Sequence, residues 1–210
     1  MSTDKKYLAG ATLWLLSCQY YLVQLIAATA WPVGLSYSWR YNTISDLANT
    51  VCGPYGKRVV CSPDHSLMNA SFIMLGLTMI GGAVLLHHRY AAGRLALVGF
   101  GALVVAGVGT IMVGLFPENT VSGLHVLGAA LPFTLGNLGM ILINVRAPML
   151  PRWLRAYGLL SGVVGLVALA LFTTHVYLWL GIGGMERFVS YPQSIWMTIF
   201  GLWALLQRKR

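Results

Sequence analysis

The chain has 210 residues, of which 57% are hydrophobic and 9% are charged, and its formal net charge at pH 7 is +9. Soluble domains usually carry about 25% charged residues, so this composition excludes a soluble globular protein and indicates an integral membrane protein. In such a protein the basic residues set the orientation of the helices, so the positive charge does not indicate a nucleic-acid partner.

Six apolar stretches come close to the roughly 20 residues that a helix needs to cross a bilayer core. In chain order they are Tyr7 to Ala30, Ser66 to Leu86, Gly93 to Leu115, Gly123 to Asn144, Tyr157 to Leu180 and Tyr191 to Leu206. Their connections are short except for a long loop at 31–64, and no polar linker separates them. The sequence therefore predicts an all-α protein, a six-helix transmembrane bundle, with residues 1–210 in a single domain.

The charged residues indicate which way the bundle faces. With the N-terminus inside, ten of the 14 Lys and Arg residues fall in cytoplasmic segments, which predicts that both termini are cytoplasmic and that the loop at 31–64 is outside. Acidic residues have little effect on orientation, yet four of the five map to the outer face. These four are Asp46, Asp64, Glu118 and Glu186.

Two of the three cysteines, Cys52 and Cys61, flank a turn in the outer loop. The outer side of a membrane is oxidising and the spacing suits a hairpin, so a disulfide is plausible. The sequence leaves a disulfide and two free thiols equally open.

Further polar residues map to the same outer face as the four acids. Such groups are costly in hydrocarbon, so those within a helix are expected to face the bundle interior or a water-filled cavity. We therefore expect one polar cavity that opens outward. Its predicted lining is Arg40, Asp46, Asp64, His65, Asn69, Glu118, His125, Glu186 and Arg187.

A carboxyl group kept protonated by an apolar setting can donate its proton to an olefin or epoxide, and aromatic faces can stabilise the resulting carbocation. The candidate catalytic residues for this chemistry are Asp46, Asp64, Glu118, Glu186, His65 and His125. The candidate substrate-binding residues are Arg40, Asn42, Asn69, Trp39, Tyr41, Arg187 and Tyr191. For any single Trp or Tyr, the aromatic belt at a membrane interface is the more common explanation.

Two other chemistries and one structural interpretation use the same outer residues. His65, His125 and His175 would bind zinc together with a carboxylate, although no HExxH or paired CxxC motif supports this. Basic residues of the outer loops would hold a lipid phosphate without reaction, and these are Arg40, Lys57, Arg58 and Arg187. In the structural interpretation Arg40 pairs with Asp46, or Arg187 pairs with Glu118, and the pairs tie the loops over the bundle.

Several segments in order, "YSWRYNTISDL", "GPYGKRVVCSPDHSLMNASF", "GLFPEN", "GLHVLGA" and "GIGGMERFVSYP", resemble the bacterial integral-membrane family DUF998 over about residues 35 to 205. That family is linked to the Frag1 and DRAM-like group, which implies a six-helix architecture and assigns no activity. In size, helix class and acid placement the chain also resembles small integral-membrane terpene cyclases, whose carboxylic acids protonate prenylated substrates.

From the residues and this resemblance we expect a multi-pass enzyme of the cell membrane that protonates and then cyclises or isomerises an isoprenoid or similar apolar substrate. The expected partners are an apolar or lipid-like small molecule and membrane lipids, with no nucleic acid, no metal and no cofactor. The alternatives are a non-catalytic lipid-binding or transport protein, and a structural subunit in which every outer acid is paired and no cavity exists.

Overall fold

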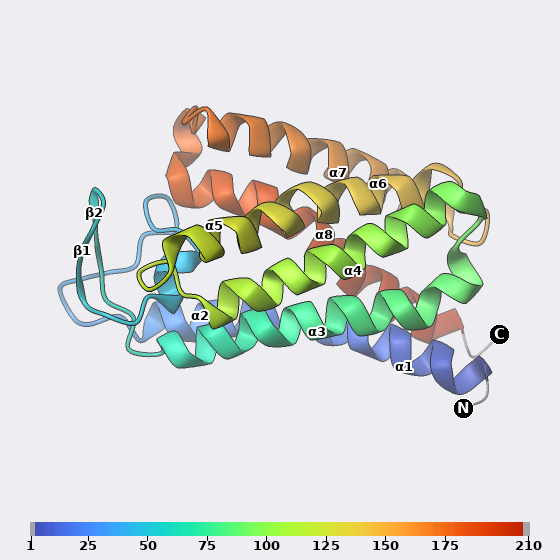
Figure 1. Cartoon of the computed structure of the whole chain (residues 1–210), viewed down its shortest axis with the longest axis horizontal. Coiled ribbons are helices and arrows are strands. Elements are labelled where there is room, and N and C mark those ends of the chain that lie inside the picture. Colours follow the sequence, from blue (N-terminus) through green and yellow to red (C-terminus); the bar gives the residue numbers. More distant parts are fainter. Residues whose placement is uncertain (1–2, 208–210) are drawn as a thin grey trace.

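The computed structural model describes residues 3–207 as a bundle of long helices with one small β-hairpin at one end (Figure 1). Its helices are α1 (Thr3–Leu16), α2 (Gln19–Thr29), α3 (His65–Tyr90), α4 (Gly93–Leu115), α5 (Ser122–Leu131), α6 (Asn137–Val145), α7 (Arg152–Thr173) and α8 (Gly181–Leu206). A short π-helix, η2 (Pro132–Gly136), joins α5 to α6, and α2 continues the path of α1, so the chain builds six helical units. The predicted all-α six-helix bundle is confirmed.

Five of these units are long and apolar enough to cross a membrane, which makes the chain a multi-pass membrane protein. The sixth, α8, begins at Gly181, ten residues before the predicted start at Tyr191. Glu186 and Arg187, which the sequence placed in a loop, therefore lie within the helix. Its start is hidden in the sequence because these charged side chains interrupt the apolar pattern, while in the fold both are buried.

Both ends of the described chain lie at one end of the bundle, which we call the terminal end (Figure 1). The Tyr7 hydroxyl of α1 donates a hydrogen bond to the Ala204 carbonyl of α8 there. Nearby, Trp14 makes an edge contact with Phe200, with the ring centroids 4.9 Å apart, and lies 5.3 Å from Trp196. The first and last helices are thus fixed against each other.

Close backbone contacts hold α4 at the centre of the bundle. A Cβ atom on Gly76 of α3 would lie 2.4 Å from the Gly107 carbonyl oxygen of α4, and one on Gly99 of α4 would lie 2.7 Å from the Gly139 oxygen of α6. Only glycine permits such approach, which gains dispersion contacts in a lipid environment. The glycines at these contacts therefore serve packing.

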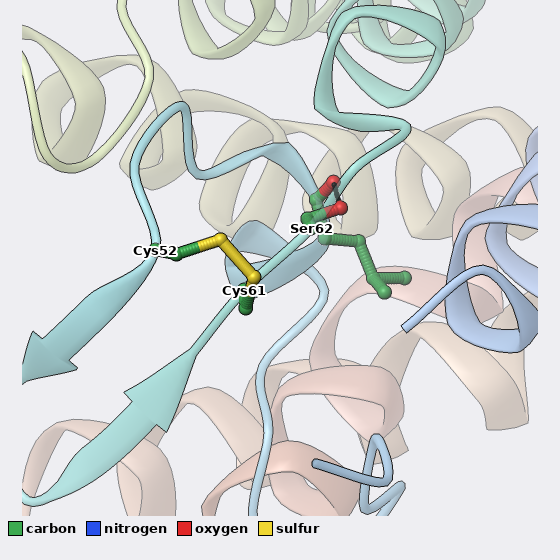
Figure 2. The surroundings of a disulfide bond; sticks show 4 residues. Cys52, Cys61 and Ser62 are labelled. Carbon is green, nitrogen blue, oxygen red and sulfur yellow. Dashed lines mark hydrogen bonds between the residues drawn. A yellow bond between two sulfur atoms is a disulfide. The ribbon is translucent and has the colours of Figure 1, made fainter. Parts of the chain in front are cut away.

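The loop at 31–64 covers the opposite end, which we call the hairpin end (Figure 1). It contains the 3₁₀ turn η1 (Ser45–Ala48) and the antiparallel strands β1 (Gly53–Tyr55) and β2 (Arg58–Val60). A disulfide between Cys52 and Cys61 closes the hairpin (Figure 2), which decides the alternative that the sequence left open. The next residue, Ser62, donates its hydroxyl to the Leu47 carbonyl at 2.6 Å and so fixes the hairpin to η1.

Candidate functional site

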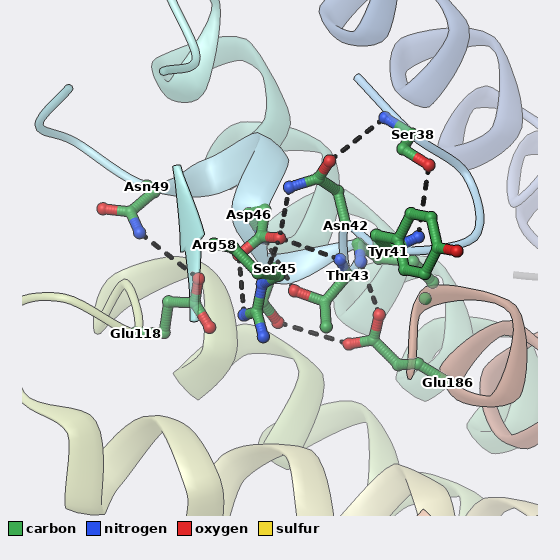
Figure 3. Close-up of polar contacts among 12 residues, drawn as sticks. Ser38, Tyr41, Asn42, Thr43, Ser45, Asp46, Asn49, Arg58, Glu118 and Glu186 are labelled. Carbon is green, nitrogen blue, oxygen red and sulfur yellow. Dashed lines mark hydrogen bonds and ion pairs between the residues drawn. The ribbon is translucent and has the colours of Figure 1, made fainter. Parts of the chain in front are cut away.

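Asp46 anchors the loop at the hairpin end. Its carboxylate is fully buried and accepts hydrogen bonds from the Thr43 amide at 2.9 Å and the Asn42 side chain at 3.0 Å (Figure 3). Arg58 of β2 adds a bidentate ion pair, with Nε 2.8 Å from Oδ2 and Nη2 2.9 Å from Oδ1. Charge-assisted bonds of this bidentate kind are among the strongest in proteins, so they fix the position of the carboxylate.

The predicted pairing of Arg40 with Asp46 is wrong, because the hairpin folds back and places Arg58 on that carboxylate. Arg40 itself is exposed, with its guanidinium 5.3 Å from the Tyr41 ring centroid. Within residues 3–207, Arg58 to Asp46 is the only ion pair. The interpretation in which every outer acid is paired to a base therefore fails for the described chain.

Arg187 binds the loop rather than an acid, so its predicted pairing with Glu118 is also wrong. Its Nη1 donates to the carbonyls of Trp39 at 3.1 Å, Asn42 at 3.2 Å and Gly183 at 2.8 Å, and Nη2 donates to the Tyr37 hydroxyl. The guanidinium also lies 4.6 Å from the Trp39 ring centroid, a cation–π contact. Arg187 thus fastens the first loop to the start of α8.

Glu186, one residue earlier, is buried and turns to a different part of the loop. One carboxyl oxygen accepts the Ile44 amide proton, and the other lies 3.5 Å from the Ser45 hydroxyl (Figure 3). No cation of the described chain forms an ion pair with it. Taking a charged carboxylate out of water without a cationic partner is costly, so burial favours the neutral acid.

Ser45 connects Glu186 to His125 on α5. The Ser45 oxygen is 3.0 Å from His125 Nε2, and His125 Nδ1 is 2.9 Å from the Phe116 carbonyl. A carbonyl only accepts, so in the neutral imidazole Nδ1 carries the proton and Nε2 accepts from Ser45. Ser45 therefore lies between Glu186 and His125, and polar contacts connect the three side chains.

Glu118, in the connection between α4 and α5, is the third buried acid at this end. It accepts a hydrogen bond from the Asn49 side chain at 3.3 Å (Figure 3), and its backbone carbonyl accepts one from Tyr55 at 3.0 Å. Burial, together with the nearby negative charge of Asp46, raises the pKa of Glu118 well above its ordinary value. The side chain is therefore neutral at pH 7.

An internal cavity lies below these groups, between the loop and the helices. Its volume is about 30 Å³, room for about one or two water molecules. Apolar and aromatic side chains form most of its wall, and Ser45 and Glu186 stand at its hairpin end. The lining residues are Tyr20, Ile44, Ser45, Phe72, Leu75, Met79, Thr110, Val113, Ala129, Pro132, Phe133, Glu186, Ser190, Gln193 and Ser194.

The cavity wall includes α8 residues that the sequence analysis did not select as site residues. Ser190, Gln193 and Ser194 are buried and line the cavity, and the Gln193 side-chain oxygen is buried without a hydrogen-bond partner among the described residues. Their spacing of three and four residues places them on one helix face. That polar stripe on an apolar helix was the available signal, but the predicted start at Tyr191 left Ser190 outside the helix, whereas α8 includes it.

The remaining predicted residues lie around the cluster or outside it. Asn69 donates to the Ala48 carbonyl at 2.9 Å, and Tyr191 donates to the Gln24 side chain at 2.8 Å, so both support the packing at this end. Asp64 directly precedes α3 and His65 begins it, and both are only partly buried. The Asp64 side chain makes no cap hydrogen bond and no ion pair within residues 3–207.

The zinc alternative does not fit this geometry. Of its three histidines only His125 lies in the buried cluster, while His175 is exposed and contacts the Tyr177 hydroxyl at 2.8 Å. In the part of the chain that the structure describes, no three His, Cys, Asp or Glu side chains are close enough to hold a metal ion.

The four basic residues predicted to hold a lipid phosphate do not form one pocket. Lys57 and Arg58 share a surface, but Arg187 is buried elsewhere.

Fold and site together define a multi-pass integral membrane protein in which Asp46, Glu118 and Glu186 meet at one end of the bundle, above an apolar cavity. The family described as "Protein of unknown function (DUF998)" matches residues 15–203. The chain belongs to this family, as its sequence resemblance indicated. No curated protein and no solved structure matches it.

Proposed function

We propose that this chain is a cell-membrane enzyme in which Glu186 protonates an apolar, isoprenoid-type substrate and so starts its isomerisation or cyclisation. One observation carries the proposal. The buried Glu186 carboxyl has no ion-pair partner in the described chain, borders an aromatic-walled cavity, and is connected through Ser45 to His125. A neutral carboxylic acid in an apolar site is the arrangement that general-acid chemistry on a carbon–carbon double bond requires.

The proposed reaction is redox-neutral and needs no co-reactant. The Glu186 proton passes to one carbon of the double bond, whose π electrons form the new C–H bond and leave a carbocation on the other carbon. The ring faces of Tyr20, Phe72 and Phe133 line the cavity and stabilise this cation. A neighbouring carbon then loses a proton to the Glu186 carboxylate, directly or after attack by a second double bond, which restores the acid.

The other acids serve different purposes in this proposal. Asp46 is held by its ion pair with Arg58 and does not line the cavity, so it acts as the loop's anchor. Glu118 is neutral but does not line the cavity, and Asp64 lies at the start of α3. Among the outer acids, Glu186 is the one that lines the cavity, and it has no ion-pair partner within residues 3–207.

Substrate access requires the cavity to widen, since its present volume holds only water. The cavity lies at the level where two of the helical units are interrupted. Tyr20 follows the break between α1 and α2, and Pro132 opens the π-helix η2. Proline removes a backbone donor, and π-helical turns occur often at functional sites. We expect separation of α5 from α2 at this level to admit the substrate, and reclosure to exclude water.

The orientation in the proposal follows the basic residues and the disulfide. The hairpin end carries the Cys52–Cys61 bond, which persists in oxidising compartments, and the terminal end carries most of the basic residues. The catalytic end therefore faces outward and both termini face the cytoplasm.

The test is proton incorporation from solvent. Purified protein in lipid nanodiscs is incubated in deuterium oxide with isoprenoid alcohols and prenylated quinols, and the products are analysed by mass spectrometry for a new carbon-bound deuterium. We expect incorporation with at least one substrate and at least a hundredfold loss in Glu186→Gln, which keeps the shape but cannot donate the proton. Asp64→Asn, a matched change outside the cavity, should retain the rate. Unlabelled substrate in every case, or full activity in Glu186→Gln, would contradict the proposal.

The second candidate is a non-catalytic lipid-binding or transport protein. The small volume of the closed cavity favours it, because about 30 Å³ cannot hold an isoprenoid chain without rearrangement. The same experiment separates the two functions. A carrier would retain the lipid in the nanodisc sample without incorporating deuterium, and Glu186→Gln would leave that retention unchanged.

A further inference from the structure

An open groove on the surface of the hairpin end is separate from the internal cavity and plays no part in the proposed chemistry. Its volume is about 670 Å³. Three segments build it, the loop before η1, the hairpin, and the connection from α7 to α8. The lining residues are Tyr41, Lys57, Arg58, His175, Tyr177, Gly181 and Ile182.

The charge of the groove is positive. Lys57 is exposed at the hairpin turn, and Arg58 beside it uses Nε and Nη2 to bind Asp46. Within residues 3–207 its remaining amino group, Nη1, has no hydrogen-bond partner and so keeps two protons for a ligand. The groove also borders Gly181 and Ile182 at the start of α8. None of its lining residues is acidic.

The connection from α7 to α8 is strained where it borders the groove. His175 and Leu178 have φ angles of 59° and 51°, in the left-handed region that side chains other than glycine rarely adopt. Between them, the Tyr177 hydroxyl lies 2.8 Å from His175 Nδ1. Strained residues of this kind cluster at binding sites, and here the strain brings the imidazole and the phenol to the groove.

Two large apolar residues of the same connection indicate that the ligand is a lipid. Leu178 is 61% exposed and Trp179 is 82% exposed, both in the short turn η3 (Leu178–Leu180). Exposed tryptophan at the end of a membrane helix is typical of the head-group level of the bilayer. A phosphate in the groove would therefore lie at the depth of lipid head groups, with acyl chains running past these side chains.

We propose that this groove binds the phosphate head group of a membrane lipid, with Lys57, Arg58 and His175 donating to the phosphate oxygens. The ligand class is a phospholipid with an exposed phosphate, of which phosphatidic acid is the simplest probe. This site holds a ligand without reaction and exists independently of proton transfer at Glu186.

The test is calorimetric titration of the protein in a neutral detergent with short-chain phosphatidic acid. The parallel titrations use the diacylglycerol of the same chain length and inorganic phosphate. We expect phosphatidic acid to bind, the diacylglycerol to bind at least tenfold more weakly, and inorganic phosphate to bind more weakly than the lipid. If the diacylglycerol bound as tightly as phosphatidic acid, the groove would not recognise a phosphate. If inorganic phosphate bound more tightly than phosphatidic acid, the ligand would not be a lipid.

The groove variant is Lys57→Gln with His175→Asn, since asparagine tolerates the left-handed backbone at position 175. We expect its dissociation constant for phosphatidic acid to rise at least tenfold, through the loss of two charge-assisted contacts. The matched control, Lys6→Gln with His88→Asn at the terminal end, should bind as the unchanged protein does. Lys57→Gln alone, in an exposed turn, gives a partial loss even if the double variant folds poorly. An unchanged constant in both groove variants, or an equal loss in the control, would refute the assignment.

Discussion

Replacing Arg58 by glutamine tests whether the ion pair with Asp46 holds the loop at the hairpin end. The Asp46 side chain is 0% exposed and that of Arg58 is 18% exposed, so removal of the guanidinium leaves a buried carboxylate without a cation. Removing one partner of a buried pair costs about 3–5 kcal/mol. Asp46 keeps the Thr43 amide and the Asn42 side chain as donors, so we expect the lower end, about 3 kcal/mol.

The measurement is reversible unfolding of Arg58→Gln in mixed detergent micelles, followed by circular dichroism. A second variant, Asp46→Asn with Arg58→Gln, removes the stranded charge and should recover about 1–3 kcal/mol relative to the sum of the single changes. The control is Lys57→Gln, an exposed neighbour whose loss should stay within about 0.5 kcal/mol. A cost below about 1 kcal/mol for Arg58→Gln, or strict additivity in the double variant, would refute the reasoning.

Three further predictions concern pH, the disulfide and helix packing. Because the folded chain raises the pKa of Glu118, the native state binds more protons than the unfolded state above about pH 4.5, so the unfolding free energy falls as pH rises through the raised pKa. For this group the unfolding free energy changes by at most about 1.4 kcal/mol per pH unit. Glu118→Gln should therefore flatten the profile of thermal midpoint against pH, and an equally steep profile in that variant would contradict the prediction. Replacing Cys52 and Cys61 by serine opens a loop with a sequence separation of 9 and should lower the unfolding free energy by about 2–3 kcal/mol, whereas reducing agent should have no effect on that variant. Gly76→Leu should abolish folded yield in size-exclusion chromatography, since even its Cβ would lie 2.4 Å from the Gly107 oxygen, while Gly101→Leu, which meets nothing within 4 Å, should behave like the unchanged protein.

The sequence predicts the helices of this protein well because a bilayer imposes a simple requirement on each of them. About 20 apolar residues in a row identify a spanning helix whatever it packs against. The prediction fails at α8, where Glu186 and Arg187 are buried inside a helix and not left in a loop. Their burial depends on the first loop, some 140 residues earlier in the chain, and no local pattern contains that information.

The same limit of local sequence patterns applies to the contacts between side chains in the site. The sequence indicates that Asp46, Glu118 and Glu186 belong to one end of the bundle, since all three follow or begin helices on one side. It does not indicate that Arg58 rather than Arg40 binds Asp46, because that choice is made by the hairpin register and the disulfide. Asp64 is an aspartate like Asp46 and is predicted on the same side of the membrane. Its position next to the start of α3 nevertheless leaves it outside the cluster.

Glu186 and Arg187 are neighbours with opposite tasks, and the helix geometry separates them. Successive residues leave an α-helix about 100° apart, so Arg187 contacts the carbonyls of the loop while Glu186 turns to Ile44 and the cavity. A residue that anchors a loop by an ion pair must be charged, whereas a general acid must be neutral. Asp46 meets the first requirement by binding Arg58. Because Arg58 is held there and Arg187 donates to the loop, neither guanidinium bonds to Glu186, and burial then favours the neutral form that the proposed general-acid role requires.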